Sequence, residues 1–552
     1  MNRRKFIKNT AAASAGSVVL GGLPVQVLAG NKALLNIASN SNTDRVLVFV
    51  QLHGGNDALN SVVPLNQYEL YSSMREQIFL PRTGSRGLIN LDGTLPADAQ
   101  GGLHPDLAPF HQMYEAGKAT LIHNVGYPNM NMSHFRGRDI VFMGVDGNSD
   151  LKPSGWMGRF LDVEYPGFPG EGENRYPTAE MPDPPGLELS GNLSLSYHRN
   201  VGIPIGFNTY DPVGLYNTIK NVGIPNTNFD YLPGKSHVRN ELEYLMDFDI
   251  STHDYGERLN QVWDNGSNSI AYPETYPYTC PDRFKQNELS HQLRTVARLL
   301  KGGIKTRIFL CRLGGFDTHG DQVLAEDKTK GIHAALLFHL SAAIKAFHDD
   351  LAAMGLEERV LTMTFTEFGR RAYSNASYGT DHGKSTPVFL FGSGLKGGVL
   401  GTNPDLTDLD RGNTKHNIDY RQVYTSVVMD WFNASEAAVN ATGFQTWKDE
   451  RLDLIEGVIN HSHVTQQDSG KLSIYPNPAN NKTNLSLFIE KTSLVKILLL
   501  DLNGKQISTI FHGKREFGPF EFQAELSGIP KGMYVVFADV NGKRITERLV
   551  IQ

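Results

Sequence analysis

The sequence predicts an α/β protein with a mostly parallel sheet, helices on both of its faces, and a small C-terminal β-sandwich. Apolar, strand-like runs such as RVLVFVQL alternate with segments whose apolar residues recur at helical spacing. Short polar motifs follow several of these runs, as expected at the carboxyl edge of a parallel sheet. Beyond residue 470, short alternating apolar runs are separated by turn residues.

Residues 1–29 are predicted to be a signal peptide, because a basic stretch precedes a small-residue apolar segment and a cleavage site follows Ala29. The pair Arg3-Arg4 resembles a twin-arginine signal. A plain secretory signal with a chance arginine pair is the alternative. The apolar segment is shorter than the roughly 20 residues of a transmembrane helix, so we expect an exported mature protein without a membrane span.

Composition excludes some classes of protein. The 552 residues carry a formal net charge of −6 and no long basic run, so no nucleic-acid partner is expected. Two cysteines, Cys280 and Cys311, cannot build a disulfide framework. The length predicts two to four domains.

Residues 30–460 are predicted to form the α/β domain. Helices are expected within FKQNELSHQLRTVARLLKGG, within GIHAALLFHLSAAIKAFHDDLAAMG, and from about Asp419 onward. Residues 160–280 are rich in Pro, Gly, Asn and Tyr and have weak periodicity. We interpret them as insertions or a cap over the active edge of the sheet.

The C-terminal part of the chain has its own pattern. Residues 461–470 are interpreted as a polar linker and residues 471–552 as the small β-sandwich. The stretches YPNPA, DLNGK, LSGIPKGMYVV and ITERLVIQ resemble the C-terminal sorting domain of the type IX secretion system. The resemblance implies transit through the periplasm, then passage by the type IX machinery to the cell surface or beyond. A carbohydrate-binding or adhesive β-sandwich is the alternative.

Acidic and imidazole side chains lie in four motifs next to predicted strands: HGGND, GGFDTHG, TEFGRR and GTDHG. The first three follow apolar runs, and the fourth precedes the run TPVFLFGSG. Carboxylates and imidazoles together suit a divalent metal ion, although turn caps would use the same residues. The candidate metal ligands are Asp57, Asp317, His319, Glu367, Asp381 and His382.

Ser133 lies where a helix (HFRGRDIVF) is expected to begin. A hydroxyl near free backbone N–H groups and the positive end of a helix suits a nucleophile that attacks a phosphate or sulfate ester. A simple N-cap is an equally good interpretation. His134 and Arg136 could hold an anionic group, and Arg370 is a candidate either for an oxyanion or for a structural salt bridge.

The order of these motifs resembles the alkaline phosphatase superfamily. More closely, HGGND, SHF, GWMGRFLD, GGFDTHG, TEFGRR and DHG resemble domain-of-unknown-function family 1501, over residues 44–435. The resemblance implies an alkaline phosphatase-like fold and a site for one or two divalent ions (zinc, calcium, manganese or magnesium). Two features depart from the superfamily: Asp317 and His319 are two residues apart rather than four, and Glu367-Phe368 stands where an Asp-His pair is usual.

The expected function is therefore that of a secreted, metal-dependent hydrolase of phosphate or sulfate esters. Ser133 or a bound water would attack, and Arg136 or Arg370 would offset the charge of the oxygens. A sulfated or phosphorylated glycan is a candidate substrate for an enzyme exported to the surface. The alternative is a non-catalytic surface binding or assembly protein on a degenerate fold, which the loss of an imidazole at Phe368 favours.

Overall fold

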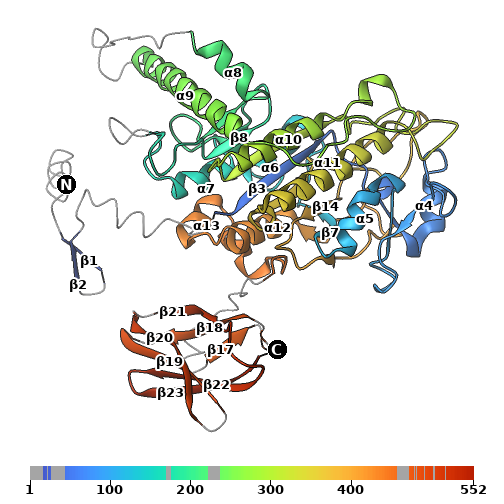
Figure 1. The fold of residues 1–552 in the computed structure, drawn as a ribbon. Helices are drawn as coiled ribbons and strands as arrows, with labels where there is room; N and C mark the ends of the chain where they lie inside the picture. The colour runs from blue at the N-terminus through green and yellow to red at the C-terminus, as the bar shows by residue number, and fades with distance from the viewer. Residues whose placement is uncertain are drawn as a thin grey trace, which may run out of the picture. The chain divides into compact units, whose positions relative to one another are not determined.

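A computed structural model describes residues 17–20, 23–26, 44–169, 176–221, 237–456 and, with short gaps, 472–551. The predicted linker, 461–470, lies outside the described residues. So does the predicted signal peptide, apart from the backbones of two paired strands, β1 (Ser17–Leu20) and β2 (Leu23–Gln26). The chain divides into two compact units, Met1–Ile455 and Glu456–Gln552 (Figure 1).

A sheet of nine strands forms the centre of the first unit, in the order β15-β7-β14-β11-β3-β10-β8-β9, with β16 beside β7. β14 is antiparallel to both of its neighbours, and every other described pairing in this sheet is parallel. The predicted α/β fold with a mostly parallel sheet is thus confirmed. The strands are β3 (Val46–His53), β7 (Ala119–Gly126), β8 (Gly186–Glu188), β9 (Gly206–Asn208), β10 (Ile308–Gly314), β11 (Val360–Phe365), β14 (Thr386–Phe391), β15 (Gly398–Leu400) and β16 (Ile418–Asp419).

The central strands are apolar on both sides because helices cover both faces of the sheet. On one face, Phe49 of β3 contacts Trp156 of α7 (Trp156–Glu164) and Tyr424 of α12 (Tyr420–Ser426). On the other face, Phe391 of β14 contacts Phe110 of α5 (Ala108–Glu115) and His348 of α11 (Ile332–Met354).

The three helices expected from the sequence are present. α10 (Glu288–Lys301) begins after Asn287, whose side chain accepts a hydrogen bond from the Ser290 backbone N–H. α11 ends at Gly355, where a φ of 71° suits glycine. α12 begins with a capping box formed by Asp419 and Gln422. No helix among the described residues has the length and apolar character of a membrane span.

The region 160–280, interpreted from its composition as an insertion or cap, contributes to the sheet itself. Its strands β8 and β9 extend the parallel sheet beyond β10. Its helices α8 (Pro212–Ile219) and α9 (His237–Asn265) pack against each other. The remaining helices and strands of this unit are α3 (Ala58–Ser61), β4 (Val62–Pro64), α4 (Tyr68–Met74), β5 (Ile89–Asn90), β6 (Gly101–Leu103), α6 (His134–Met143), β12 (Gly369–Arg370), β13 (His382–Gly383) and α13 (Glu436–Thr442).

The topology brings the polar motifs to one edge of the sheet. β3, β7, β10 and β11 run in one direction, so the loops that follow them emerge at the same end. The reversed strand β14 begins at that end, and GTDHG directly precedes it. β12 pairs with β13, which fastens the loop after β11 to the loop before β14.

The second unit contains two antiparallel sheets, β17-β18-β21 and β20-β19-β22-β23. Alternate residues of both sheets meet in one apolar core, including Leu485, Leu487, Ile497 and Val536. The predicted C-terminal β-sandwich is therefore confirmed. Its strands are β17 (Leu472–Tyr475), β18 (Lys482–Ile489), β19 (Ser493–Leu500), β20 (Gln506–Arg515), β21 (Gly518–Glu525), β22 (Gly532–Val540) and β23 (Lys543–Ile551).

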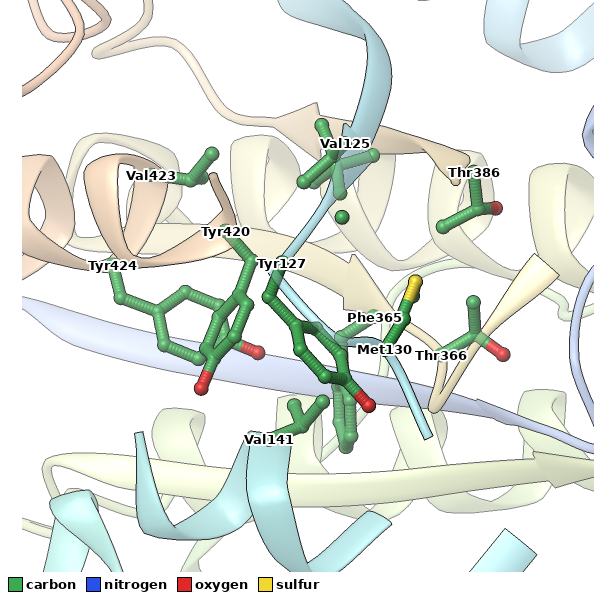
Figure 2. A pocket seen from close by; sticks show the side chains of 12 residues that line it. Val125, Tyr127, Met130, Val141, Phe365, Thr366, Thr386, Tyr420, Val423 and Tyr424 are labelled. Atoms are coloured by element: carbon green, nitrogen blue, oxygen red, sulfur yellow. The ribbon is translucent and has the colours of Figure 1, made fainter. Parts of the chain in front are cut away.

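A small cavity of about 20 Å³ lies in the core of the first unit, where β7, β11 and β14 meet α12 (Figure 2). Two of the tyrosines that line it differ in their hydrogen bonds. The hydroxyl of Tyr420 bonds to the carbonyl oxygens of Ile140 and Val145, at 3.1 and 2.6 Å. The hydroxyl of Tyr424 is buried and has no hydrogen-bond partner among the described residues.

This difference predicts different effects for two similar substitutions. Tyr420→Phe should lower the free energy of unfolding by about 1 kcal/mol or more, because the buried hydrogen bond of 2.6 Å to the Val145 carbonyl oxygen is lost. Tyr424→Phe should change it by less than about 0.5 kcal/mol, because no bond is lost. Urea unfolding of both variants measures the difference, and equal losses would contradict the assigned hydrogen bonds.

Candidate metal centre

The carboxylate of Asp317 lies at the centre of a cluster of cationic and imidazole groups. Asp317 comes from the loop after β10, and its side chain is 48% exposed, so the cluster is open to solvent. Its Oδ1 lies 2.7 Å from Nη2 of Arg370, 3.1 Å from Nε2 of His382 and 3.2 Å from Nε2 of His319. Its Oδ2 lies 3.3 Å from Nε2 of His134.

Each of the three imidazoles is held through its other ring nitrogen by an oxygen atom. The Nδ1 atoms of His134, His319 and His382 lie 2.8 Å from Glu367 Oε1, 3.3 Å from Asp381 Oδ1 and 2.8 Å from the Met132 carbonyl oxygen, respectively. A neutral imidazole that donates through Nδ1 carries a lone pair on Nε2. All three rings therefore direct Nε2 at the same carboxylate.

This donor set fits a divalent metal ion. Lone pairs that face a carboxylate repel it unless protons or a cation lie between them, and the buried Nε2 of His134 makes no hydrogen bond within the described structure. Ligand atoms of His134, Asp317 and His382 lie within 4.8 Å of one another. Histidines that bind metals usually donate their other N–H to a carboxylate or carbonyl, which is the arrangement seen at all three rings.

The chemistry of the donors favours one type of ion. Imidazole nitrogens suit zinc and similar transition metals, whereas calcium and magnesium prefer oxygen ligands. Burial raises the pKa of Asp317, but the hydrogen bond and charge of Arg370, together with the neighbouring imidazoles, outweigh it and bring this pKa down to about 2. The carboxylate is therefore charged at any physiological pH.

Arg370 is buried at 1% exposure, and its guanidinium joins the loops of the site. It donates hydrogen bonds to the backbone carbonyls of Gly54, Gly55, Phe316 and Thr380 and to the carboxylate of Asp317. These groups belong to the loops after β3 and β10 and to the segment before β13. All of these donors thus face protein atoms. Of the two roles expected for Arg370, this geometry corresponds to the structural salt bridge.

The structure does not bring Asp57 into the cluster around Asp317. The Asp57 carboxylate is completely buried and lies 2.6 Å from Nη1 of Arg75, just beyond the end of α4. Gln322 donates a second hydrogen bond to it, also at 2.6 Å. Burial raises the pKa of Asp57, but the charge and hydrogen bond of Arg75 overcome this effect and leave the pKa below its ordinary value.

Glu367 and Phe368 lie behind two of the imidazoles. The Glu367 carboxylate is fully buried and accepts hydrogen bonds from the Gly54 backbone N–H, at 2.8 Å, and from His134. The hydrogen bond to Glu367 is the main cause that raises the pKa of His134. The buried ring of Phe368 contacts His134 and His382, at centroid distances of 4.8 and 4.5 Å. The pair Glu367-Phe368 therefore positions histidines and closes the cluster on one side.

The remaining predicted residues, Ser133, Arg136 and Asp381, differ in their surroundings. Ser133 is exposed at the N-cap of α6, and its hydroxyl makes no capping hydrogen bond. The guanidinium of Arg136 donates to the backbone carbonyl of Ser149. Asp381 is half-exposed and contacts His319.

Two important residues were not among the predicted metal ligands or ion pairs. The sequence indicates His134 only as an anion-binding group, although its position directly after Ser133, at the same sheet edge, also suits a metal ligand. Arg75 lies in no motif, so nothing in the sequence pointed to its pairing with Asp57.

Comparison with known proteins found a family match within each of the two units. Residues 283–423 match the model of a protein family of unknown function, DUF1501. The DUF1501 match contains GGFDTHG, TEFGRR and GTDHG, whereas HGGND and Ser133 precede it. Residues 473–552 match a secretion system C-terminal sorting domain, which implies export to the cell surface or beyond.

No curated protein matches the chain. Solved structures similar to it include a Bacteroides thetaiotaomicron protein of glycosaminoglycan metabolism, designated 4S-sulf, at 10% identity and a TM-score of 0.33, covering 92% of this chain and 89% of that chain. Another is a 2-O GAG sulfatase, at 8% identity and a TM-score of 0.27, covering 92% and 84%. A phosphonate monoester hydrolase from Silicibacter pomeroyi has 10% identity and a TM-score of 0.22, covering 92% and 89%.

Arg370 and its neighbour Arg371 allow a matched test of the hydrogen bonds by which Arg370 joins the loops of the site. Arg370→Ala should lower the free energy of unfolding by about 3 kcal/mol or more, because several buried carbonyls lose their donor. Arg371→Ala should change it by less than about 0.5 kcal/mol, because that side chain is exposed. Denaturant unfolding measures both, and equal effects would contradict the role of Arg370.

The ion pair of Asp57 and Arg75 predicts a loss of stability in acid. Since the folded-state pKa of Asp57 lies below the ordinary value, its contribution is present above that value and is lost as pH falls through the folded pKa. Asp57→Asn should cost about 3 kcal/mol at pH 7, and the difference from the wild type should shrink below about pH 4. Asp44→Asn, at an exposed ion pair with Arg359, is the control and should cost less than about 1 kcal/mol at every pH. A difference that is independent of pH would contradict the prediction.

Proposed function

We propose that this protein is an exported, metal-dependent hydrolase of phosphate or sulfate esters. The observation that carries the proposal is the convergence of three imidazole Nε2 atoms on Asp317, each ring being held by an oxygen at Nδ1. A divalent ion between these groups would satisfy all three rings at once, without a proton on each Nε2.

The residues that would hold the ion are His134, Asp317 and His382, with His319 completing the set from the solvent side. When bound, a zinc-like ion would polarise the ester oxygen and neutralise charge that develops on it. Glu367, Asp381 and the Met132 carbonyl would fix the orientation of the three rings.

Ser133 is the proposed nucleophile. It directly precedes His134, its hydroxyl is exposed, and that hydroxyl is not engaged in capping α6. The free backbone N–H groups and the dipole at the start of this helix favour an anionic group beside it. Ser133 would therefore attack the phosphorus or sulfur atom of an ester whose anionic part is held against the first turn of α6. The bond from this atom to the substrate oxygen would break, and the alcohol would leave with the serine proton. Water would then hydrolyse the serine ester and release phosphate or sulfate.

Export is supported independently by the sorting domain at residues 473–552. An enzyme at the cell surface meets polymers too large to enter the cell. A sulfated or phosphorylated glycan is therefore the substrate class that we favour.

A second candidate function is non-catalytic binding at the surface. The observation in its favour is that Asp57, the acid of the first motif, is neutralised by Arg75, so this motif supplies no ligand to the cluster. In that case an ion held by the histidines would organise a binding surface without turnover.

Metal analysis and ester assays of the purified full chain test the proposal. We expect about one zinc-like ion per chain, hydrolysis of an aryl phosphate or aryl sulfate, and a loss of about a thousandfold in kcat for Ser133→Ala without loss of metal. His382→Ala should bind the metal at least tenfold more weakly. His291→Ala, at an exposed position on α10, is the control and should change neither quantity.

The outcomes separate the two candidate functions. Absence of bound metal, with no tight binding after dialysis, contradicts the metal-dependent hydrolase. Bound metal without turnover of phosphate, phosphodiester or sulfate esters favours the binding protein. Turnover that Ser133→Ala leaves unchanged excludes a serine nucleophile.

A further inference from the structure

A second group of basic side chains lies beside the Asp317 cluster, and the proposed chemistry does not use it. Its members are His53 at the end of β3, Arg312 near the end of β10, and Arg138 on α6. The exposed ring of Phe135 lies next to them on α6. We call these four residues the cationic subsite.

The strand register places Arg312 and His53 on the same face of the sheet. Arg312 pairs with Gln51, and Gly314 pairs with His53, in the parallel pairing of β10 with β3. Because residues two apart on a strand point to the same side, the side chains of Arg312 and His53 are diagonal neighbours, about 7–8 Å apart at their backbones.

α6 covers this same face. Phe49 shares the face of Gln51 and His53 and stacks on Phe365, which in turn contacts Phe142 of α6. At the other end of the helix, the ring of His134 stacks on His53 at a centroid distance of 6.0 Å. Arg138 lies one turn further along α6 than His134, so it projects from the same side of the helix.

Three carboxylates also lie around this group. Asp139 contacts the Arg138 guanidinium at 3.3 Å. Glu188 is buried and accepts a hydrogen bond from the Ser194 backbone N–H, and Glu367 is buried and bonded to His134.

Arg312 and Phe135 are available to a ligand. The Arg312 side chain is exposed and makes no hydrogen bond or ion pair within the described parts of the chain. Phe135 is 75% exposed, with the Arg138 guanidinium 6.0 Å from its ring. An exposed aromatic ring bordered by cations suits a ligand that has both an apolar face and an anionic substituent.

We propose that Arg138, Arg312 and Phe135 bind a second anionic group of the substrate, on the sugar unit next to the one that carries the scissile ester. The substrate class is then a polysaccharide sulfated on successive units. Planar guanidinium groups bind sulfate through paired hydrogen bonds. This inference rests on the proposed function for the position of the scissile ester.

A polysaccharide fits better than a nucleic acid. The chain has a net charge of −6, and two arginines are far fewer cations than nucleic-acid binding requires. The sorting domain implies export to the cell surface or beyond, where anionic polysaccharides are accessible.

The test compares polyanion binding with turnover of a small ester. The double variant Arg138→Gln/Arg312→Gln should bind dextran sulfate about a hundredfold more weakly in titration calorimetry of the full chain, about tenfold for each arginine. Its kcat/KM for an aryl ester with a single anionic group should stay within about twofold of the wild type. The control, Arg283→Gln/Arg294→Gln, removes the same charge at exposed positions and should leave dextran sulfate binding unchanged.

The possible outcomes are distinguishable. If the double variant and the control bind dextran sulfate equally well, the proposed role of the cationic subsite in polysaccharide binding is wrong. Wild-type protein that binds single-stranded DNA or uncharged dextran as tightly as dextran sulfate overturns the assignment to a sulfated polysaccharide. If the double variant loses dextran sulfate binding but the wild type hydrolyses no aryl ester, the subsite is supported and the proposed hydrolase fails.

Discussion

The guanidinium of Arg370 is the interaction on which the geometry of the candidate site depends. Its donors bind carbonyls of the loops after β3 and β10 and of the segment before β13, as well as the carboxylate of Asp317. A lysine could not replace it, because only the planar guanidinium presents five donors in a fixed fork. The loops must also approach closely: a Cβ on Gly54, whose φ is 125°, would lie 2.2 Å from the backbone nitrogen of Asp317. Glycine at this position is therefore a geometric requirement.

Much of the fold could be predicted because its determinants are local. Apolar strands, the stops at Gly302 and Gly355, and the cap at Asp419 are all visible in short windows of sequence. The position of the polar motifs at one edge of the sheet could also be predicted, since parallel strands end at one edge. The short strands β8 and β9 were not predictable, because segments of three residues become strands only through the partner that the rest of the sheet provides.

The roles of individual site residues were less accessible. Asp57 and Asp317 look alike in sequence, each following a strand and a pair of glycines. One is completely buried against Arg75 and the other is half-exposed among imidazoles, and only tertiary packing distinguishes them. Glu367 likewise carries the chemistry of a ligand, but burial places it behind His134 rather than beside the open carboxylate. Residue type predicts what a side chain can bind, whereas depth in the fold decides what it reaches.

The separation of these residues along the chain has a consequence for how the protein would take up the proposed metal ion. His134 and Glu367 are 233 residues apart, and Met132 and His382 are 250 apart. A partial chain that ends before Glu367 or His382 lacks part of this set of donors. We therefore expect loading to follow folding, because the donors of a metal site rarely come together in an unfolded chain. The compartment in which the first unit folds would thus determine which metal it takes up.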